Sequence, residues 1–230
     1  SARERNAEYA TLKALGFGCP FLLMTSGGGL TTLANAIRFP IRLVESGPAG
    51  GAILAAEIAG ELGLDRVVSY DMGGTTAKIC LIDDGAPLST RTFEVARAYR
   101  NLRGSGLPVR IPAIEMVEIG AGGGSIAHVD GMGRLEVGPE SAGSAPGPAC
   151  YDLGGVNATV TDADVVLGKI EPSRFAGGSV KLDPAKAEAA VSAAVGVPLG
   201  MTTPLAAFAI AEIVDENMAN AARVHAIEWG

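Results

Sequence analysis

The segment DMGGTT at residues 71–76 places one acid, two glycines and two hydroxyl side chains within six positions. It lies between the hydrophobic runs Arg66–Tyr70 and Ala77–Ile82, where one strand is expected to turn into the next. Glycine has no Cβ, so its backbone N–H can approach a phosphate, and the threonine hydroxyls add donors. Asp71 would repel a bare phosphate, so it indicates a hydrated Mg²⁺ between carboxylate and phosphate. The alternative is a tight Gly-Gly hairpin, which accounts for the glycines but not for the acid.

A second glycine loop, GAGGGS at residues 120–125, lies between Ile119 and Ile126. It could cradle an oxyanion or add a phosphate contact, with Ser125 as a donor, or it could be a flexible turn. His128 and Asp130 follow on one face of an expected strand and could present two metal ligands. The chain has only two histidines, which favours a solvated or hydrogen-bonded His128 over a metal ligand.

Cys150 lies in the proline-containing stretch SAGSAPGPACYD. It could be a nucleophile, but no sequence neighbour would lower its pKa, so a rigid loop that shapes a pocket is the favoured interpretation. Asp162 and Asp164 favour a helix N-terminus, with a metal or substrate role as the minor alternative. His225, on the expected last helix, is interpreted as structural.

Six blocks occur in a fixed order: MTSGGG, ESGPAGG, YDMGGTTAK, IGAGGGSIAHVD, VGPESAGSAPGPACYDLGG and TVTDADVVLG. In this order they resemble the hydantoinase A / 5-oxoprolinase family of the actin-like ATPase superfamily, over nearly all 230 residues. The resemblance implies an α/β fold: part of an actin-like (ribonuclease H-like) ATPase core with a β-rich insertion. It also implies ATP-dependent opening of a cyclic amide of the hydantoin, N-methylhydantoin or 5-oxoproline type, in which phosphorylation of the amide oxygen prepares the ring carbon for water.

The resemblance also assigns roles to residues of both motifs. Asp71 would order Mg²⁺ through water, and Glu45 would assist it. The residues expected to hold the ATP phosphates are Gly73, Gly74, Thr75 and Thr76, and those expected near the transferred phosphate or the substrate are Gly122, Gly123, Gly124 and Ser125.

The family's first phosphate loop is expected upstream and its nucleotide-base segment downstream, so the chain is interpreted as a fragment of a larger hydantoinase A-type domain. A second subunit or a C-terminal domain of hydantoinase B type is the expected partner. His128 departs from the aromatic residue expected at that position. Two alternatives stay open: an acetone-carboxylase-type subunit that activates a ketone with ATP, and a non-catalytic scaffold fragment.

The net charge of −7 and the lack of a Lys/Arg-rich run argue against nucleic acid or an anionic membrane surface as the main partner. No window has the uncharged apolar length of a membrane span. Three widely spaced cysteines without a CxxC pair indicate reduced thiols and a cytoplasmic location.

The expected elements divide the chain into three segments. Residues 1–83 form an α/β segment with the second phosphate loop, residues 84–160 a β-rich glycine/proline segment, and residues 161–230 a helical segment. The first segment is expected to have helices at 2–15, 30–38 and 48–62 and strands at 20–25, 41–44, 66–70 and 77–82. The second segment is expected to have short strands within RTFEVA, RIPAIEMVEI, SIAHVD and GRLEVG. The third segment is expected to have helices that open at Thr161, Asp183 and Thr203, the last of which packs through Leu205, Phe208, Ala209 and Ile213.

Overall fold

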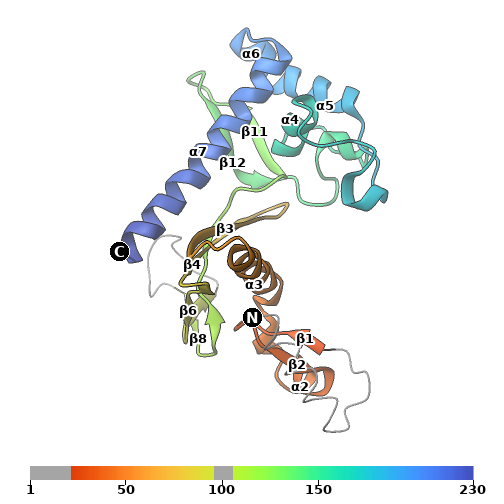
Figure 1. The fold of residues 1–230 in the computed structure, drawn as a ribbon. Helices are drawn as coiled ribbons and strands as arrows, with labels where there is room; N and C mark the ends of the chain where they lie inside the picture. The colour runs from red at the N-terminus through yellow and green to blue at the C-terminus, as the bar shows by residue number, and fades with distance from the viewer. Residues whose placement is uncertain (1–21, 96–105, 230) are drawn as a thin grey trace. The chain divides into compact units, whose positions relative to one another are not determined.

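A computed structural model describes residues 22–95 and 106–229 (Figure 1). Internal contacts divide the chain into two compact units. Unit 1 holds the chain up to Asp71 and Ile79–Val117, and unit 2 holds Met72–Lys78 and Glu118–Gly230. The DMGGTT segment therefore begins in unit 1 with its acid and continues in unit 2 with its glycines and threonines. The expected helix at 2–15 and Cys19 lie outside the described residues.

Unit 1 combines short antiparallel strands with one long helix. Strand β3 (Arg66–Met72) and strand β4 (Ala77–Asp83) lie in a sheet of order β10-β4-β3, in which β5 (Ala86–Pro87) pairs with β4. The other elements of this part of the chain are β1 (Leu22–Met24), β2 (Leu30–Thr32), α2 (Leu33–Arg38), the 3₁₀ turn η1 (Pro40–Leu43), α3 (Ser46–Glu61), β6 (Ser89–Thr90), β7 (Phe93–Val95), β8 (Leu107–Val109) and β9 (Ala113–Ile114).

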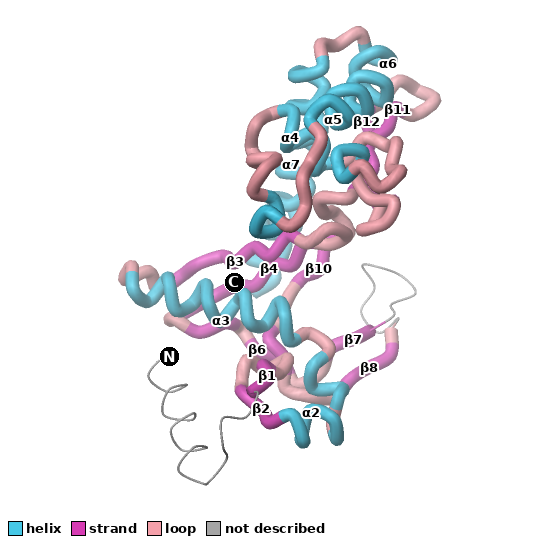
Figure 2. Tube along the Cα trace, turned by 90° about the vertical axis from the view of Figure 1, so that its right-hand side faces the viewer, coloured by secondary structure: helices cyan, strands magenta, loops and turns pink. Residues whose placement is uncertain are grey.

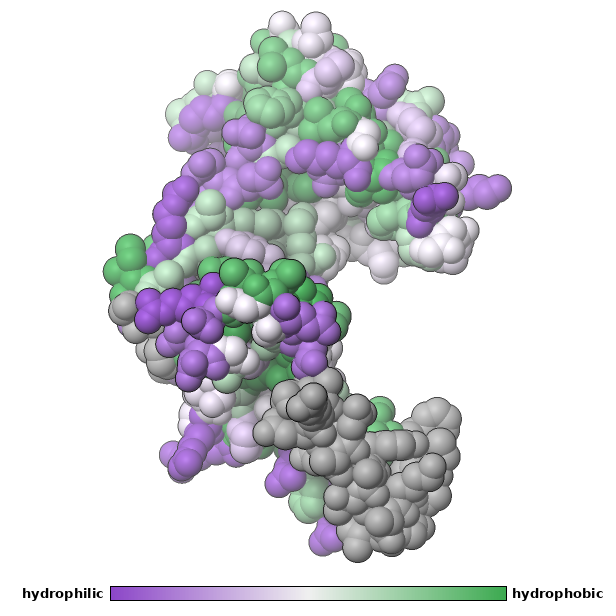
Figure 3. All heavy atoms as spheres, in the orientation of Figure 1, coloured by the Kyte–Doolittle hydropathy of each residue, from purple (hydrophilic) through white to green (hydrophobic). Residues whose placement is uncertain are grey.

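Helix α3 packs through its smallest side chains. Its buried residues are Ala49, Ala52, Ala56 and Ala59, and the first two join Cys80 and Ile114 in one hydrophobic cluster. Alanine and glycine let the helix backbone approach β1, β5 and β9 closely. The larger apolar residues Leu54, Ile58 and Leu62 are exposed, and Figure 3 shows hydrophobic surface over the part of unit 1 that carries this helix.

Unit 2 is a β-hairpin covered by helices. Figure 2 shows α4, α5 and α7 gathered around β11 and β12, and the core between them includes Ala127, Val160, Val191, Ile210 and Val214. The elements of this part of the chain are β10 (Val117–Ile119), β11 (Ser125–Val129), β12 (Leu135–Ser141), the 3₁₀ turn η2 (Ala149–Tyr151), α4 (Val160–Val166), the 3₁₀ turn η3 (Phe175–Gly178), α5 (Pro184–Val191), the π-helical turn η4 (Ser192–Gly196), α6 (Val197–Leu199) and α7 (Thr203–Trp229).

Two predictions in the first segment need correction. The strand expected at Ile41–Val44 is a 3₁₀ turn, because Pro40 at its first position fixes φ in the helical range and starts a turn. The helix expected from Leu30 begins only at Leu33, since the Thr32 hydroxyl accepts the Asn35 N–H and caps it there.

Two predictions for the last helices were also wrong. Helix α4 is capped by Thr159, not Thr161, because Thr159 forms a capping box with Asp162 two residues earlier than expected. Helix α7 does not pack through Leu205 and Phe208, each of which is 51% exposed. Its buried face carries Ala206, Ala207, Ile210, Ala211, Val214 and Met218.

Within the described residues, no single helix is long and apolar enough to span a membrane. The pair Pro184–Leu199 and Thr203–Glu228, bent by 90°, meets the length and composition criteria only when the two helices are taken together.

Asp162 is a buried carboxylate that ties two segments of unit 2 together. Its Oδ2 accepts the Thr159 N–H at 2.9 Å and the Thr159 hydroxyl at 2.8 Å, which fixes the start of α4. The carboxylate also accepts the N–H groups of Ala149, at 3.2 Å, and Cys150, at 2.7 Å. Four donors offset the cost of burying the charge. The observed role of Asp162 is therefore to hold the proline-containing loop against α4.

We expect Asp162→Asn to lower the free energy of unfolding by about 3 kcal/mol, because the amide would turn a donor toward a buried N–H. Asp164→Asn is the matched control, since Asp164 lies on the same helix with its side chain 22% exposed. We expect the control to change stability by less than about 1 kcal/mol. Urea unfolding of both variants measures the difference, and equal losses would contradict the role given to Asp162.

Candidate functional site

The DMGGTT segment forms the turn between β3 and β4, as the sequence predicts. The Gly73 N–H donates to the Thr76 carbonyl at 2.9 Å and closes the turn. Gly73, Gly74 and Thr75 are exposed, whereas Thr76 is half-buried. The tip of the turn is thus open to solvent.

The second glycine loop packs directly against the backbone of this turn within unit 2. The Gly123 N–H donates to the Gly73 carbonyl at 3.0 Å, and the Gly124 N–H donates to the Gly74 carbonyl at 2.7 Å. Both motifs predicted to act on phosphate, at 73–76 and 122–125, are therefore in contact.

These hydrogen bonds fix which way the turn presents its donors. In a trans peptide the C=O and N–H groups point in opposite directions. The peptides that join Gly73 to Gly74 and Gly74 to Thr75 are both trans. Since both carbonyls point toward the second loop, the N–H groups of Gly74 and Thr75 point away from it. Two successive N–H groups on one side make a concave donor site for an anion.

The close approach of the two loops requires glycine. A Cβ on Gly122 would lie 2.7 Å from the Gly73 oxygen and 2.8 Å from the Gly74 carbonyl carbon and oxygen. A Cβ on Gly124 would lie 2.9 Å from the same Gly74 oxygen. Because the clashing atoms belong to the backbone, no side-chain rotation relieves them.

Ser125 supports the second loop from inside. Its hydroxyl oxygen accepts the Gly122 N–H at 3.0 Å, and the residue is 1% exposed. The structure thus places Ser125 within the loop, and direct contact of this hydroxyl with a phosphate stays a prediction.

The two acidic residues named from the sequence lie in unit 1 around α3. Glu45 directly precedes the helix and its N–H donates to Ser26 Oγ at 3.2 Å. The Asp71 carboxylate lies over Gly51, where a Cβ would come within 3.5 Å of Oδ2. Gly51 lies six positions after Glu45, which is a rise of about 9 Å along a helix axis. Asp71 is exposed, so its oxygens can reach a hydrated cation.

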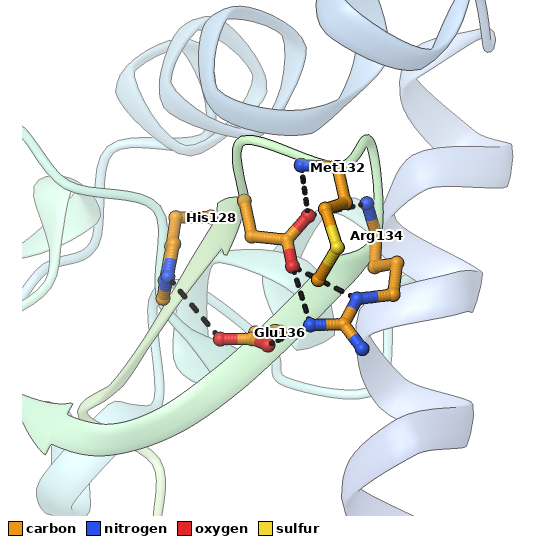
Figure 4. Close-up of polar contacts among 5 residues, drawn as sticks. His128, Met132, Arg134 and Glu136 are labelled. Carbon is orange, nitrogen blue, oxygen red and sulfur yellow. Dashed lines mark hydrogen bonds and ion pairs between the residues drawn. The ribbon is translucent and has the colours of Figure 1, made fainter.

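His128 and Asp130 do not form a metal site in the structure (Figure 4). Asp130 Oδ1 accepts the N–H groups of Met132 and Arg134 at 2.9 and 2.8 Å, and Oδ2 accepts Arg134 Nε at 2.8 Å. The backbone N–H and the guanidinium of Arg134 lower the pKa of the Asp130 carboxyl. His128 Nε2 lies 3.7 Å from Glu136 Oε2. Among the described residues, no group of three or more His, Cys, Asp or Glu side chains could hold a metal.

The described cysteines are poorly suited to nucleophilic chemistry. Burial raises the pKa of Cys80 to about 11. Burial and the nearby Asp162 carboxylate raise the pKa of Cys150 further. Both thiols are buried and reduced. This environment agrees with the interpretation of 141–152 as a structural loop. His225 is also buried, on α7.

Sequence reasoning missed the contact between the second loop and the start of α4. The Thr161 N–H and hydroxyl both donate to the Gly123 carbonyl, each at 2.8 Å. The capping-box spacing of Thr159 and Asp162 is the sequence signal that places the helix start correctly. No local signal pairs Thr161 with a glycine 38 positions earlier.

Comparison with known proteins gives a consistent family match. The family model described as hydantoinase/oxoprolinase matches residues 3–229. The acetophenone carboxylase gamma subunit of Aromatoleum aromaticum is 43% identical over 94% of this chain and 28% of its own length. Acetone carboxylase, solved for the mechanism of ATP-dependent acetone carboxylation, is 28% identical with a TM-score of 0.73, covering 96% of this chain and 30% of that one.

The ATP-dependent caprolactamase of Pseudomonas jessenii is 34% identical with a TM-score of 0.68, over 96% of this chain and 31% of that one. The two structural matches confirm the predicted mixed α/β fold of the actin-like ATPase class. The chain spans about a third of the length of these relatives.

We expect Gly122→Ala to destabilise unit 2 by about 2 kcal/mol or more, because the added methyl meets two backbone groups of the first loop. Gly131→Ala is the matched control, since a Cβ there meets nothing within 4 Å. Thermal unfolding should show a lower Tm for the first variant and an unchanged Tm for the second. Equal Tm values would contradict the close packing of the two loops.

We expect Cys80 and Cys150 to resist thiol reagents at pH 8 in the folded state. With a pKa of about 11, roughly one Cys80 thiol in a thousand is ionised at this pH. Labelling of a Cys19→Ser variant with Ellman's reagent, with and without denaturant, measures this protection. The folded chain keeps these protons while the unfolded chain releases them near pH 9, so their contribution lowers stability as pH rises above that value. Rapid native labelling would contradict the assigned burial.

Proposed function

Because the chain belongs to the hydantoinase/oxoprolinase family, we propose that it forms the central part of an ATP-dependent enzyme that opens a cyclic amide. The observation that carries this proposal is the tethering of the Gly73 and Gly74 carbonyls, which turns the next two N–H groups toward solvent. A phosphate is the ligand that suits such a pair of donors.

The first loop fits a phosphate in three respects. Its two N–H groups point the same way, its tip is exposed, and Thr75 adds a hydroxyl donor beside them. A loop held by backbone hydrogen bonds keeps this geometry before a ligand arrives, so little ordering cost falls on binding. Gly73, Gly74, Thr75 and Thr76 are the residues proposed to contact the ATP phosphates.

Asp71 is proposed to hold Mg²⁺ through water, with Glu45 assisting. Mg²⁺ keeps several waters and is commonly bound by one or two carboxylates together with substrate phosphates. Asp71 fits this donor set because it is exposed and lies two positions before Gly73. A cation there would neutralise the repulsion between the carboxylate and a phosphate.

ATP would supply the phosphoryl group: the amide oxygen forms a bond to the γ-phosphorus as the bond to ADP breaks. Water would then add to the activated ring carbon, after which inorganic phosphate leaves and the ring C–N bond breaks to give a carboxylate and an amine. The role proposed for the chain is to orient the phosphates and to offset charge during transfer. Residues 122–125 are proposed to lie near the transferred group. A hydroxyl or thiol nucleophile is unnecessary on this route, which agrees with the raised pKa of Cys150.

Activation of a ketone is the second candidate function. The 43% identity to an acetophenone carboxylase subunit and the likeness to acetone carboxylase support it. In that case ATP would phosphorylate an enolate oxygen instead of an amide oxygen. The third candidate is a scaffold without catalysis.

A second subunit or a C-terminal domain of hydantoinase B type is the proposed partner, and the subunit name of the acetophenone carboxylase relative supports assembly with a partner subunit. A cytoplasmic location is proposed from the sparse, reduced cysteines. A phosphate-release assay with ATP separates the two enzyme candidates. Release that depends on an added lactam favours the amide hydrolase, and release that depends on an added ketone with bicarbonate favours the ketone-activating enzyme.

We expect the longest form of the protein that its gene encodes to bind Mg-ATP, and Asp71→Asn to weaken that binding about tenfold through loss of the cation-facing charge. Asp83→Asn is the control, since Asp83 is an exposed acid on β4 that pairs with Arg66 at 3.1 Å. Isothermal titration with and without Mg²⁺ measures both. No Mg-ATP binding by the unmodified protein would overturn the proposed function, and an equal effect of the two variants would remove the role given to Asp71.

A further inference from the structure

Thr161 donates two hydrogen bonds to the second glycine loop. Its N–H and its hydroxyl each lie 2.8 Å from the Gly123 carbonyl oxygen. Thr161 is 5% exposed, so these bonds form away from bulk water. A Cβ on Gly123 would lie 2.7 Å from Thr161 Oγ1, which leaves no space between the two residues.

Gly123 passes this restraint on to the first loop. Its carbonyl is held by Thr161, while its N–H donates to the Gly73 carbonyl at 3.0 Å. Gly124 reinforces the contact by donating to Gly74, and its own carbonyl accepts the Ala142 N–H at 2.8 Å. The orientation of the Gly73 and Gly74 peptides is therefore set from the side of α4.

Thr161 itself is anchored by the start of α4. The capping box of Thr159 and Asp162 fixes the first turn of the helix. Asp162 is fully buried and also holds the 149–150 backbone. The Ala127 N–H donates to the Ala158 carbonyl at 2.9 Å, which joins the chain before the helix to β11. A helix start with this many restraints can serve as a fixed reference for a flexible glycine loop.

We propose that Thr161 is a positioning residue, which sets the direction of the Gly74 and Thr75 N–H groups by way of Gly123. This inference rests on the proposed function, in which those N–H groups bind a phosphate of ATP. Loss of the Thr161 hydroxyl leaves one hydrogen bond on the Gly123 carbonyl. The peptide that joins Gly123 to Gly124 can then tilt. The peptides of Gly73 and Gly74, which hydrogen-bond to the second loop, would tilt with it.

The test compares Thr161→Val with Thr161→Ser in the longest form of the protein that its gene encodes. Valine keeps the shape and removes the donor, whereas serine keeps the donor. Val165→Ala is the control for a merely structural effect, because Val165 is buried on the same helix in the hydrophobic cluster with Cys150, Leu182 and Ala187. Two quantities are measured: the Kd for Mg-ATP, and amide hydrogen exchange over residues 72–78 without nucleotide.

We expect Thr161→Val to raise the Kd for Mg-ATP about fivefold and to speed amide exchange over residues 72–78. Thr161→Ser should show the Kd and the exchange rates of the unmodified protein. Val165→Ala should lower the Tm while leaving both quantities unchanged. Unchanged exchange over 72–78 in Thr161→Val would overturn the positioning role, whether or not nucleotide binds. Failure of the unmodified protein to bind Mg-ATP would overturn the proposed function alone, since the exchange measurement still decides how Thr161 acts on the loop.

Discussion

The contact on which the candidate site depends is a pair of backbone hydrogen bonds between two glycine loops. Gly123 and Gly124 donate to the Gly73 and Gly74 carbonyls at 3.0 and 2.7 Å. Such an approach is possible only because Gly122 and Gly124 carry no Cβ, so it explains the glycines of the second loop, whereas a Cβ on Gly74 would meet nothing within 4 Å. It also decides which groups remain for a ligand, because each carbonyl that is held leaves the N–H on the other side of its peptide turned outward.

This contact needs support because glycine backbones lose the most conformational freedom on folding. Unit 2 supplies that support through hydrogen bonds from polar side chains rather than through the packing of large apolar side chains. Asp162, buried with four donors, fixes the start of α4, and Thr161 then fixes the second loop. The hydrophobic core around α4, α5 and α7 consists mostly of alanine and valine. Small side chains keep the helix starts and the glycine loops near one another, so a short hydrogen-bonded path suffices.

The sequence predicts the local parts of this arrangement well. The DMGGTT turn between two strands, the helix expected from Pro48 and observed from Ser46, and the Asp183 cap of α5 all follow from short-range rules on glycine, helix spacing and capping. The errors arise where tertiary contacts decide. Leu205 and Phe208 have the spacing of a packing face, yet α7 buries a neighbouring face that combines Ala206 and Ala207 with Ile210 and Val214, because the packing partners of the helix decide which face turns inward. The pairing of Thr161 with Gly123 joins distant positions, and no local pattern encodes it.

In the proposed function, a site built from backbone N–H groups would bind the part of the reaction that different family members share, which is the phosphoryl group of ATP. Under that proposal, the N–H groups of Gly74 and Thr75 would suit a phosphoryl group whatever oxygen receives it, because they would contact only the transferred group. An amide oxygen and an enolate oxygen would present the same phosphate to this loop. Relatives named as a caprolactamase and as a ketone carboxylase can therefore share the loop while differing in substrate. Selection between substrates then falls to side chains that face the acceptor, and neither glycine loop supplies an exposed one beyond the hydroxyl of Thr75.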